Sequence, residues 1–232
     1  MAATSMLLKL SVLLNLLSSS RFGLWPDRKH AGVFPPTCGR IECPSFDVVH
    51  AGDGYEVRRL NSTVWMSTAP IPDISLVEAT RSGFLQLFDY IQGKNSYEEQ
   101  IEMTAPVITE VSPSDGPFCT SSFIVSFYVP KENQVSPPPA EGLHAQRWKP
   151  VYVAVRQFGG FVTDSDVAVE AAALEASLSG TTWANAIQKS REKESSASTS
   201  AYTVAQYNSP FEFDNRVNEI WMPFDMEDAS SV

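Results

Sequence analysis

The order of predicted elements is repeated along the chain, and this repeat constrains the fold more than any single motif. In each half, the pattern indicates strands, then a helix, then two further strands. The segment YEVR at residues 55–58 also has an echo in YVAVR at residues 152–156. Strands grouped around two helices, each helix packed on one sheet face, indicate an α+β domain with the form of a distorted β-barrel. A ligand cleft is expected between the helices and the curved sheet.

The strands are predicted from short apolar and β-branched runs that are bounded by turn residues. They cover residues 46–50, 55–60, 64–67, 101–108 and 123–129 in the first half, and 151–158, 203–207 and 217–222 in the second. Residues 131–148 contain three consecutive prolines and are predicted to connect the two halves. Residues 188–201 are charged and then serine-rich, which is typical of a mobile surface loop.

The first helix carries the clearest local signals. Ser75 is a good N-cap, Glu78 stands three residues later at the capping-box distance, and Gly93 ends the helix. Its large apolar side chains recur at helical spacing on one face: Phe84, Leu87, Phe88 and Ile91. The second helix is predicted to begin near residues 164–166. Its inner side is expected to consist of Val167, Ala171, Leu174 and Leu178.

Residues 1–26 are predicted to be a targeting segment, because they contain no acid and the apolar stretch 6–17 precedes three serines. This stretch is too short to span a bilayer and favours a secretory signal over an organelle transit peptide or an uncleaved cytosolic end. We expect an irregular segment at 27–45, the domain at 46–224 and a flexible end at 225–232. The expected location is the secretory pathway or outside the cell, with plastid or cytosol as alternatives, and no stable membrane span remains after leader removal.

The three cysteines are too few for a disulfide framework, but two of them lie close together. Cys38 and Cys43 enclose four residues and can pair in an oxidising compartment, which leaves Cys119 as a free, buried thiol. The dipeptide Cys43-Pro44 also occurs in haem-responsive proteins whose thiolate ligates iron, and this interpretation is less favoured. Asn61 begins an Asn-Ser-Thr sequon, a glycosylation site if the chain enters the secretory route.

Charge and motif content exclude several classes of function. The net charge is −10 and no run of Lys and Arg occurs, so nucleic acid is not an expected partner. The sequence lacks phosphate-binding glycine loops, a His-Glu-x-x-His metal helix and a Gly-x-Ser-x-Gly nucleophile turn. The contexts of His30, His50 and His144 do not suggest a zinc site or a catalytic triad. We therefore expect no enzymatic activity.

One cation lies close to the apolar face of the first helix. Arg81 precedes Phe84 by about one helical turn. An apolar surface beside a guanidinium suits a flat hydrophobic ligand with carboxylates, because Arg binds a carboxylate through two hydrogen bonds. The alternative, which the spacing alone favours, is that these side chains form the core between helix and sheet.

Six ordered segments carry a family signature. They are YEVR (55–58), GF (83–84) with YIQGKN (90–95), IEMTAPV (101–107), YVP (128–130) with PP (137–138), RQFGGF (156–161), and YNSP (207–210) through NEIW (218–221). Together they span about residues 46–224 and resemble the SOUL haem-binding family. The leader and the segment around Cys38 and Cys43 resemble the plant members of that family.

The resemblance implies a fold, a ligand and a set of site residues. The fold is a distorted barrel of two β-α-β-β units with two flanking helices. The ligand is haem or another tetrapyrrole such as protoporphyrin IX, bound reversibly and without turnover against the first helix. The matching site residues are Arg81, Phe84, Leu87 and Phe88. Asp89 stands where some relatives carry Lys, which disfavours a propionate contact at that position.

This chain departs from one animal relative at the position of a proposed axial histidine. Arg59 follows the YEVR segment at that place. Because Arg stays protonated, it is not an ordinary ligand of haem iron. We expect binding through the porphyrin face and its carboxylates, which would also admit protoporphyrin IX.

The sequence therefore predicts a tetrapyrrole carrier or buffer. One alternative is a protein-interaction module in which the helix at residues 174–178 docks into a partner's groove, although that segment is rich in Ala and Ser and has few large anchors. Another is an enzyme that acts on a bulky apolar ligand, with Glu102 and Tyr128 as candidate side chains.

Overall fold

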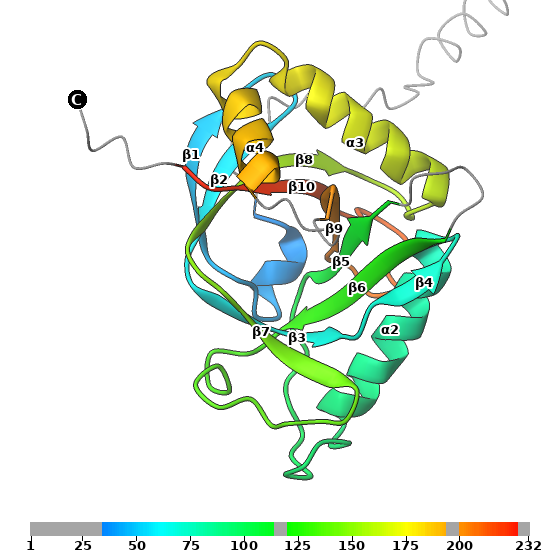
Figure 1. Cartoon of the computed structure of the whole chain (residues 1–232). Helices are drawn as coiled ribbons and strands as arrows, with labels where there is room; N and C mark the ends of the chain where they lie inside the picture. The colour runs from blue at the N-terminus through cyan, green and yellow to red at the C-terminus, as the bar shows by residue number, and fades with distance from the viewer. Residues whose placement is uncertain (1–33, 114–119, 194–199, 227–232) are drawn as a thin grey trace, which may run out of the picture.

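The computed structural model describes residues 34–113, 120–193 and 200–226, in which one curled sheet carries helices on its convex side (Figure 1). The strands are Phe46–Ala51 (β1), Glu56–Leu60 (β2), Thr63–Thr68 (β3), Ile71–Asp73 (β4), Val107–Ser112 (β5), Ser121–Tyr128 (β6), Leu143–Trp148 (β7), Val151–Phe158 (β8), Tyr202–Gln206 (β9) and Asn218–Phe224 (β10). The helices are Pro36–Gly39 (η1, a 3-10 turn), Leu76–Ile91 (α2), Asp164–Leu178 (α3) and Thr182–Lys193 (α4). The predictions for residues 1–26, for His30 and for Cys119 lie outside the described residues.

The order of strands in the sheet displays the internal repeat. The ten strands are antiparallel, in the order β1-β2-β8-β10-β9-β5-β6-β3-β7, and β4 pairs with β6. The order is symmetric about the pair β5–β9, since β6 and β3 follow on one side and β10 and β8 on the other. β2 and β7 occupy corresponding places in this order, and each pairs with a strand of the other half, β2 with β8 and β7 with β3. The predicted α+β distorted barrel is therefore confirmed.

Two predicted surface segments contain regular structure. β7 lies within the predicted connection 131–148, and α4 overlaps the predicted loop 188–201. β7 is an edge strand with no fully buried residue, so it shows no apolar alternation. In the part of α4 that overlaps the predicted loop, residues 188–193, no side chain is buried, so this part lacks the apolar stripe by which a helix is recognised. The predictions were wrong at residues 143–148 and 188–193, and for the same reason: little apolar surface is buried by either segment.

The strand predicted at residues 101–108 begins only at Val107. Residues 101–106 are held by individual hydrogen bonds and not by the continuous hydrogen-bond ladder of a β-strand. Thr104 Oγ1 donates a hydrogen bond of 2.6 Å to the carbonyl of Tyr128, and the amide of Ile101 donates to the carbonyl of Ile91. Pro106 has no amide hydrogen for a ladder, which agrees with a strand that starts after it.

The core lies on both faces of the sheet. On the convex face, α3 buries Val167, Ala171, Leu174 and Leu178 against the sheet, and this predicted inner side is confirmed. On the concave face, Trp65 packs edge-on against Tyr128 and Trp221, with ring centroids 5.5 and 6.4 Å apart. Within the described ranges, no helix combines the length and the apolarity that crossing a membrane requires.

Candidate functional site

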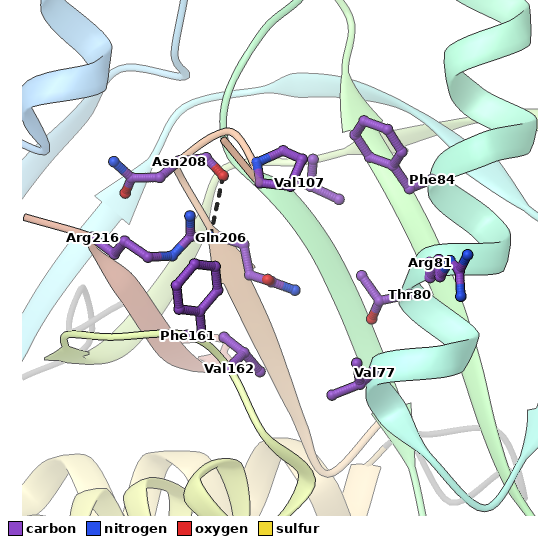
Figure 2. A pocket seen from close by; sticks show the side chains of 11 residues that line it. Val77, Thr80, Arg81, Phe84, Val107, Phe161, Val162, Gln206, Asn208 and Arg216 are labelled. Carbon is purple, nitrogen blue, oxygen red and sulfur yellow. Dashed lines mark hydrogen bonds between the residues drawn. The ribbon is translucent and has the colours of Figure 1, made fainter. Parts of the chain in front are cut away.

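A groove of about 280 Å³ lies between α2 and two loops of the second half (Figure 2). This volume is near the lower end of the range of small-molecule sites, which runs from about 300 to 1,000 Å³. Most of its lining is apolar. The lining residues are Val77, Thr80, Arg81, Phe84, Val107, Phe161, Val162, Gln206, Asn208, Pro210 and Arg216.

The floor of the groove is the pair of strands at the centre of the sheet. Val107 of β5 pairs there with Gln206 of β9, so both halves of the chain contribute to the site. A hydrogen bond of 2.8 Å between the hydroxyls of Thr80 and Thr109 fixes α2 above this floor. The repeat therefore places the groove at the junction of its two units.

A glycine lets α2 approach the sheet closely. A Cβ at Gly83 would lie 2.5 Å from Cβ and Cγ2 of Val125, closer than side chains tolerate. The next residue, Phe84, turns towards the groove and contacts Phe127, with ring centroids 5.3 Å apart. In the GF segment, Gly83 therefore allows the close contact between α2 and the sheet, and Phe84 lines the groove.

The opposite wall consists of two loops that contact each other. Phe161, in the β8–α3 loop, lies over Arg216, whose guanidinium carbon is 4.2 Å from the ring centroid. Phe161 also contacts Phe213, with centroids 5.9 Å apart. The two rings are 49% and 71% exposed. They therefore extend the apolar surface beyond the groove itself.

Two cations belong to the groove, and neither has a strong carboxylate partner in the described part of the chain. Arg216 is only 6% exposed. Its Nη1 donates to the carbonyls of Ser209 and Glu212 at 2.7 and 2.6 Å, its Nη2 donates to the carbonyl of Asn208 at 3.4 Å, and its Nε has no partner among the described residues. Burial lowers the pKa of Arg216, and the charge of Glu212 opposes this shift. Arg81 is exposed at the rim, 3.8 Å from Glu78. Within the described residues, neither guanidinium therefore lies closer than 3.8 Å to a carboxylate.

The four site residues predicted from sequence fall in different environments. Arg81 and Phe84 line the groove. Phe88 lies one turn further, stacked on Phe84 and 41% exposed. Leu87 is 0% exposed and packs in the core between α2 and the sheet. Asp89 is exposed and pairs with Lys94 at 3.1 Å.

The second wall was not predicted from the sequence. Phe161 and Asn208 belong to segments that resemble the family, but nothing local indicated that they line a site. Nothing in the sequence indicated a binding role for Gln206 or Arg216. Their role depends on the pairing of β9 with β5, which brings them opposite α2.

Among the described residues, no side chain of a type that ligates haem iron lines the groove. Its lining contains no His, Cys or Met, and the described ranges hold no cluster of three or more metal-binding side chains. His50 contacts the rings of Tyr55 and Trp183, and His144 is exposed on β7. Arg59 is exposed on β2 and is not part of the lining.

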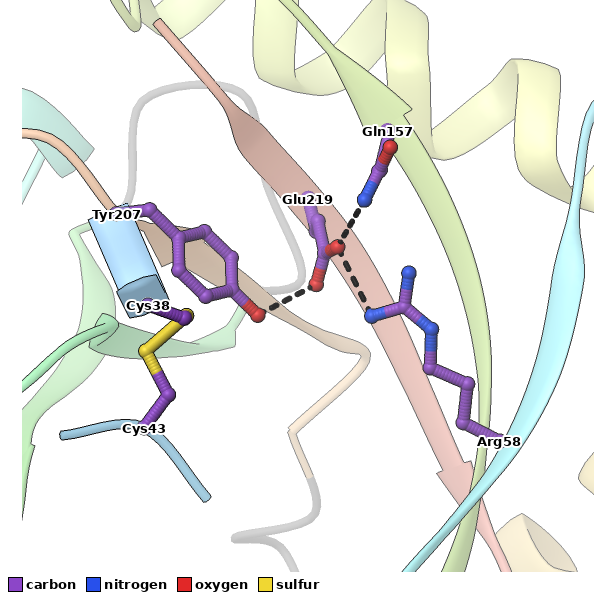
Figure 3. Close-up of a disulfide and its surroundings, with 6 residues drawn as sticks. All are labelled: Cys38, Cys43, Arg58, Gln157, Tyr207 and Glu219. Atoms are coloured by element: carbon purple, nitrogen blue, oxygen red, sulfur yellow. Dashed lines mark hydrogen bonds and ion pairs between the residues drawn. A yellow bond between two sulfur atoms is a disulfide. The ribbon is translucent and has the colours of Figure 1, made fainter. Parts of the chain in front are cut away.

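A buried charge network occupies the concave side of the sheet (Figure 3). Glu219 accepts four hydrogen bonds, from Arg58 at 2.9 Å, Gln157 at 2.7 Å, Tyr207 at 2.9 Å and Trp221 at 2.7 Å. Burial alone would lower the pKa of Arg58, but Glu219 and other neighbours raise it overall. Burial, followed by the charge of Glu219, raises the pKa of Tyr207. The environment therefore keeps Arg58 protonated and Tyr207 neutral, and the hydrogen bonds of the network link β2, β8 and β10.

The N-terminal segment covers this concave side. Cys38 and Cys43 form a disulfide and pack, with Ile41, against the concave core. Asn61 is exposed in the turn between β2 and β3, whereas Thr63 of the same sequon is buried and accepts a hydrogen bond from Trp65 Nε1.

Comparison with known proteins identifies similar chains. The family model described as SOUL heme-binding protein matches residues 41–223. Heme-binding protein 2 of Homo sapiens is 35% identical over 170 residues, which cover 72% of this chain and 77% of that protein. Heme-binding protein 1 of Sus scrofa is 26% identical over 190 residues, which cover 79% and 93%. Among solved structures, the EcmrR C-terminal domain aligns with a TM-score of 0.43 at 11% identity, covering 75% of this chain and 98% of that domain.

Proposed function

The chain belongs to the SOUL heme-binding protein family, and we propose on this basis that it binds haem or another tetrapyrrole reversibly, as a carrier or buffer. We place the ligand in the groove beside α2. The observation that carries this proposal is the pairing of an apolar groove with two cations, Arg81 and Arg216, that lack strong carboxylate partners in the described residues.

The groove fits the two chemical parts of a tetrapyrrole. The flat macrocycle would lie against Phe84 and Phe161, because apolar and aromatic surfaces are removed from water together. Its carboxylates would meet Arg81 at the rim or Arg216 in the wall. Since the groove is small, part of the macrocycle would extend over the exposed rings of Phe88 and Phe213.

We propose that recognition does not depend on iron. The described lining residues include no side chain that ligates haem iron, and Arg59 is not one of them. The free energy of binding would then come from the macrocycle and its carboxylates, which haem and protoporphyrin IX share. The two ligands are therefore expected to bind with comparable affinity.

The lining supports binding without turnover. In the part of the chain that the structure describes, it contains no carboxylate, imidazole or thiol, the groups that most often act as acid, base or nucleophile. The hydroxyl of Thr80 is bonded to Thr109. Glu102 is exposed elsewhere, and Tyr128 belongs to the concave core. Neither side chain is placed to act on a ligand in the groove.

Titration of the full chain with haemin and, separately, with protoporphyrin IX tests the proposal. Soret absorbance and tryptophan quenching should show saturable one-to-one binding in the micromolar range for both. The variant Arg81→Ala/Phe84→Ala should bind about tenfold more weakly or worse, a loss of about 1.4 kcal/mol.

A matched control variant lacks one cation and one exposed aromatic ring that lie outside the groove. Lys94→Ala/Tyr97→Ala should bind like the wild type, because neither residue lines the groove. Equal affinity of the groove variant and the control would contradict this placement. Protoporphyrin IX binding about a hundredfold more weakly than haemin would contradict recognition without iron.

We also propose that the protein works in the secretory pathway or outside the cell. The Cys38–Cys43 disulfide supports this, because disulfides persist in oxidising compartments. In eukaryotic cells, the protein should be secreted without residues 1–26, and glycosidase treatment should shift its mobility. Asn61→Gln should abolish that shift. An intact, unglycosylated chain confined to the cytosol or a plastid would disprove this location.

A further inference from the structure

We propose that the N-terminal segment closed by the Cys38–Cys43 disulfide is a brace for one wall of the groove, so that the state of this disulfide sets ligand affinity. The brace is residues 35–45, and the wall loop is residues 207–217, which connect β9 to β10. The effect on affinity rests on the proposed function. The effect on the order of the wall loop does not.

The brace is anchored to the concave side of the sheet. The amide of Ala105 donates a hydrogen bond of 2.9 Å to the carbonyl of Glu42. The amide of Lys131 donates to Glu42 Oε1 at 3.1 Å. Cys38 and Cys43 pack against the cluster that contains Tyr207, the first residue of the wall loop (Figure 3). One face of the brace is thus fixed, and the wall loop begins beside it.

A side chain of the brace reaches across to the middle of the wall loop. Arg40 forms an ion pair with Glu212 through Nη2. The Glu212 carboxylate also accepts hydrogen bonds from Asn208 Nδ2 at 3.1 Å and from the amide of Ser209 at 3.2 Å. Arg40 is the largest cause of the lowered pKa of Glu212. An isolated exposed ion pair stabilises little, but this one belongs to a network that sets the loop conformation.

The same loop holds the buried cation of the groove. Nη1 of Arg216 donates to the carbonyls of Ser209 and Glu212, and its guanidinium supports the ring of Phe161. Figure 2 shows Arg216, Phe161 and Asn208 together on the wall opposite α2. A contiguous set of contacts therefore leads from Arg40 through Glu212 and Arg216 to Phe161.

The shape of the brace depends on its cross-link. Its regular structure is a single 3-10 turn of four residues, so few backbone hydrogen bonds hold it in place. Opening the disulfide restores conformational freedom to the segment. A dithiol reductant donates two electrons and two protons, which convert the disulfide to two thiols while the dithiol becomes a cyclic disulfide. Reduction should then loosen Arg40 and, through it, the wall loop.

Two readouts on the full chain test the brace: amide hydrogen exchange without ligand, and haemin affinity. In Cys38→Ser/Cys43→Ser, residues 207–217 should exchange several-fold faster, and affinity should fall about fivefold or more. Arg40→Ala keeps the disulfide and should shift both readouts in the same direction by less. Lys94→Ala removes an exposed, ion-paired cation far from the wall loop and should change neither.

Dithiothreitol should also speed up amide exchange at residues 207–217 and lower haemin affinity in the wild type. In the double serine variant it should change neither readout further. Unchanged exchange at residues 207–217 would overturn the brace, and so would a uniform increase over the whole barrel. Faster exchange with unchanged haemin affinity would overturn its effect on binding. If the wild type binds no haemin, the proposed function fails, while hydrogen exchange still decides whether the brace orders the loop.

Discussion

Glu219→Ala is expected to lower the free energy of unfolding by about 3–5 kcal/mol, the usual cost of removing one partner of a buried ion pair. The carboxylate is 0% exposed and accepts four hydrogen bonds. Alanine would leave the hydroxyl of Tyr207 without this partner, and it would leave the buried guanidinium of Arg58 with Glu56, at 2.9 Å, as its remaining ion-pair partner among the described residues. Urea unfolding, followed by tryptophan fluorescence and circular dichroism, measures the change.

Glu175→Ala is the matched control, because Glu175 pairs with Arg191 on the surface at 3.4 Å. Exposed pairs contribute at most about 1 kcal/mol, so this variant should unfold almost like the wild type. If Glu219→Ala does not fold, Glu219→Gln keeps the volume and part of the hydrogen bonding and should show a smaller loss in the same direction. A loss below about 1 kcal/mol for both Glu219 variants would show that the network does not support the fold.

Leu87→Ala is expected to lower the free energy of unfolding by about 2–5 kcal/mol, the range for truncating a buried leucine and leaving a cavity. Leu87 is fully buried between α2 and the sheet, where it packs in the cluster that contains Val125 and Phe127. Leu85, on the same helix, is 56% exposed. Leu85→Ala should therefore change stability by no more than about 0.5 kcal/mol.

The same pair of variants tests whether Leu87 contacts the ligand. Under conditions where Leu87→Ala is still folded, its haemin affinity should stay close to that of the wild type, because Leu87 does not line the groove. If Leu87→Ala had unchanged stability and much weaker haemin binding, Leu87 would be a residue of the binding site, as the family resemblance implied.

Local signals in the sequence were reliable where an element buries one apolar face. The predicted N-cap is confirmed, because the Ser75 hydroxyl accepts a hydrogen bond from the amide of Glu78, while the amide of Ser75 donates to Asp73 Oδ1 in place of the Glu78 side chain of a full capping box. The inner side of α3 is likewise as predicted. These signals depend on residues three or four positions apart, so they can be recognised without tertiary information.

The candidate site could be predicted only in part. Helical periodicity put Phe84 and Leu87 on one apolar face, but it does not distinguish a side chain under the helix from one at its edge. The exposure of each residue depends on where α2 meets the sheet, and the close approach at Gly83 sets that position. The edge strand β7 and the polar helix α4 were missed because they bury little apolar surface.

The sequence by itself determined the α+β class, the repeated order of elements, the two principal helices and the family, because capping, periodicity and ordered motifs are properties of short segments. Only the tertiary structure decided which residues share a groove. Phe84 and Arg216 are far apart in the chain, and they become neighbours of one groove because β5 pairs with β9 at the junction of the two units. The pairing of strands that are distant in the sequence depends on the burial of both sheet faces, so no local pattern predicts it.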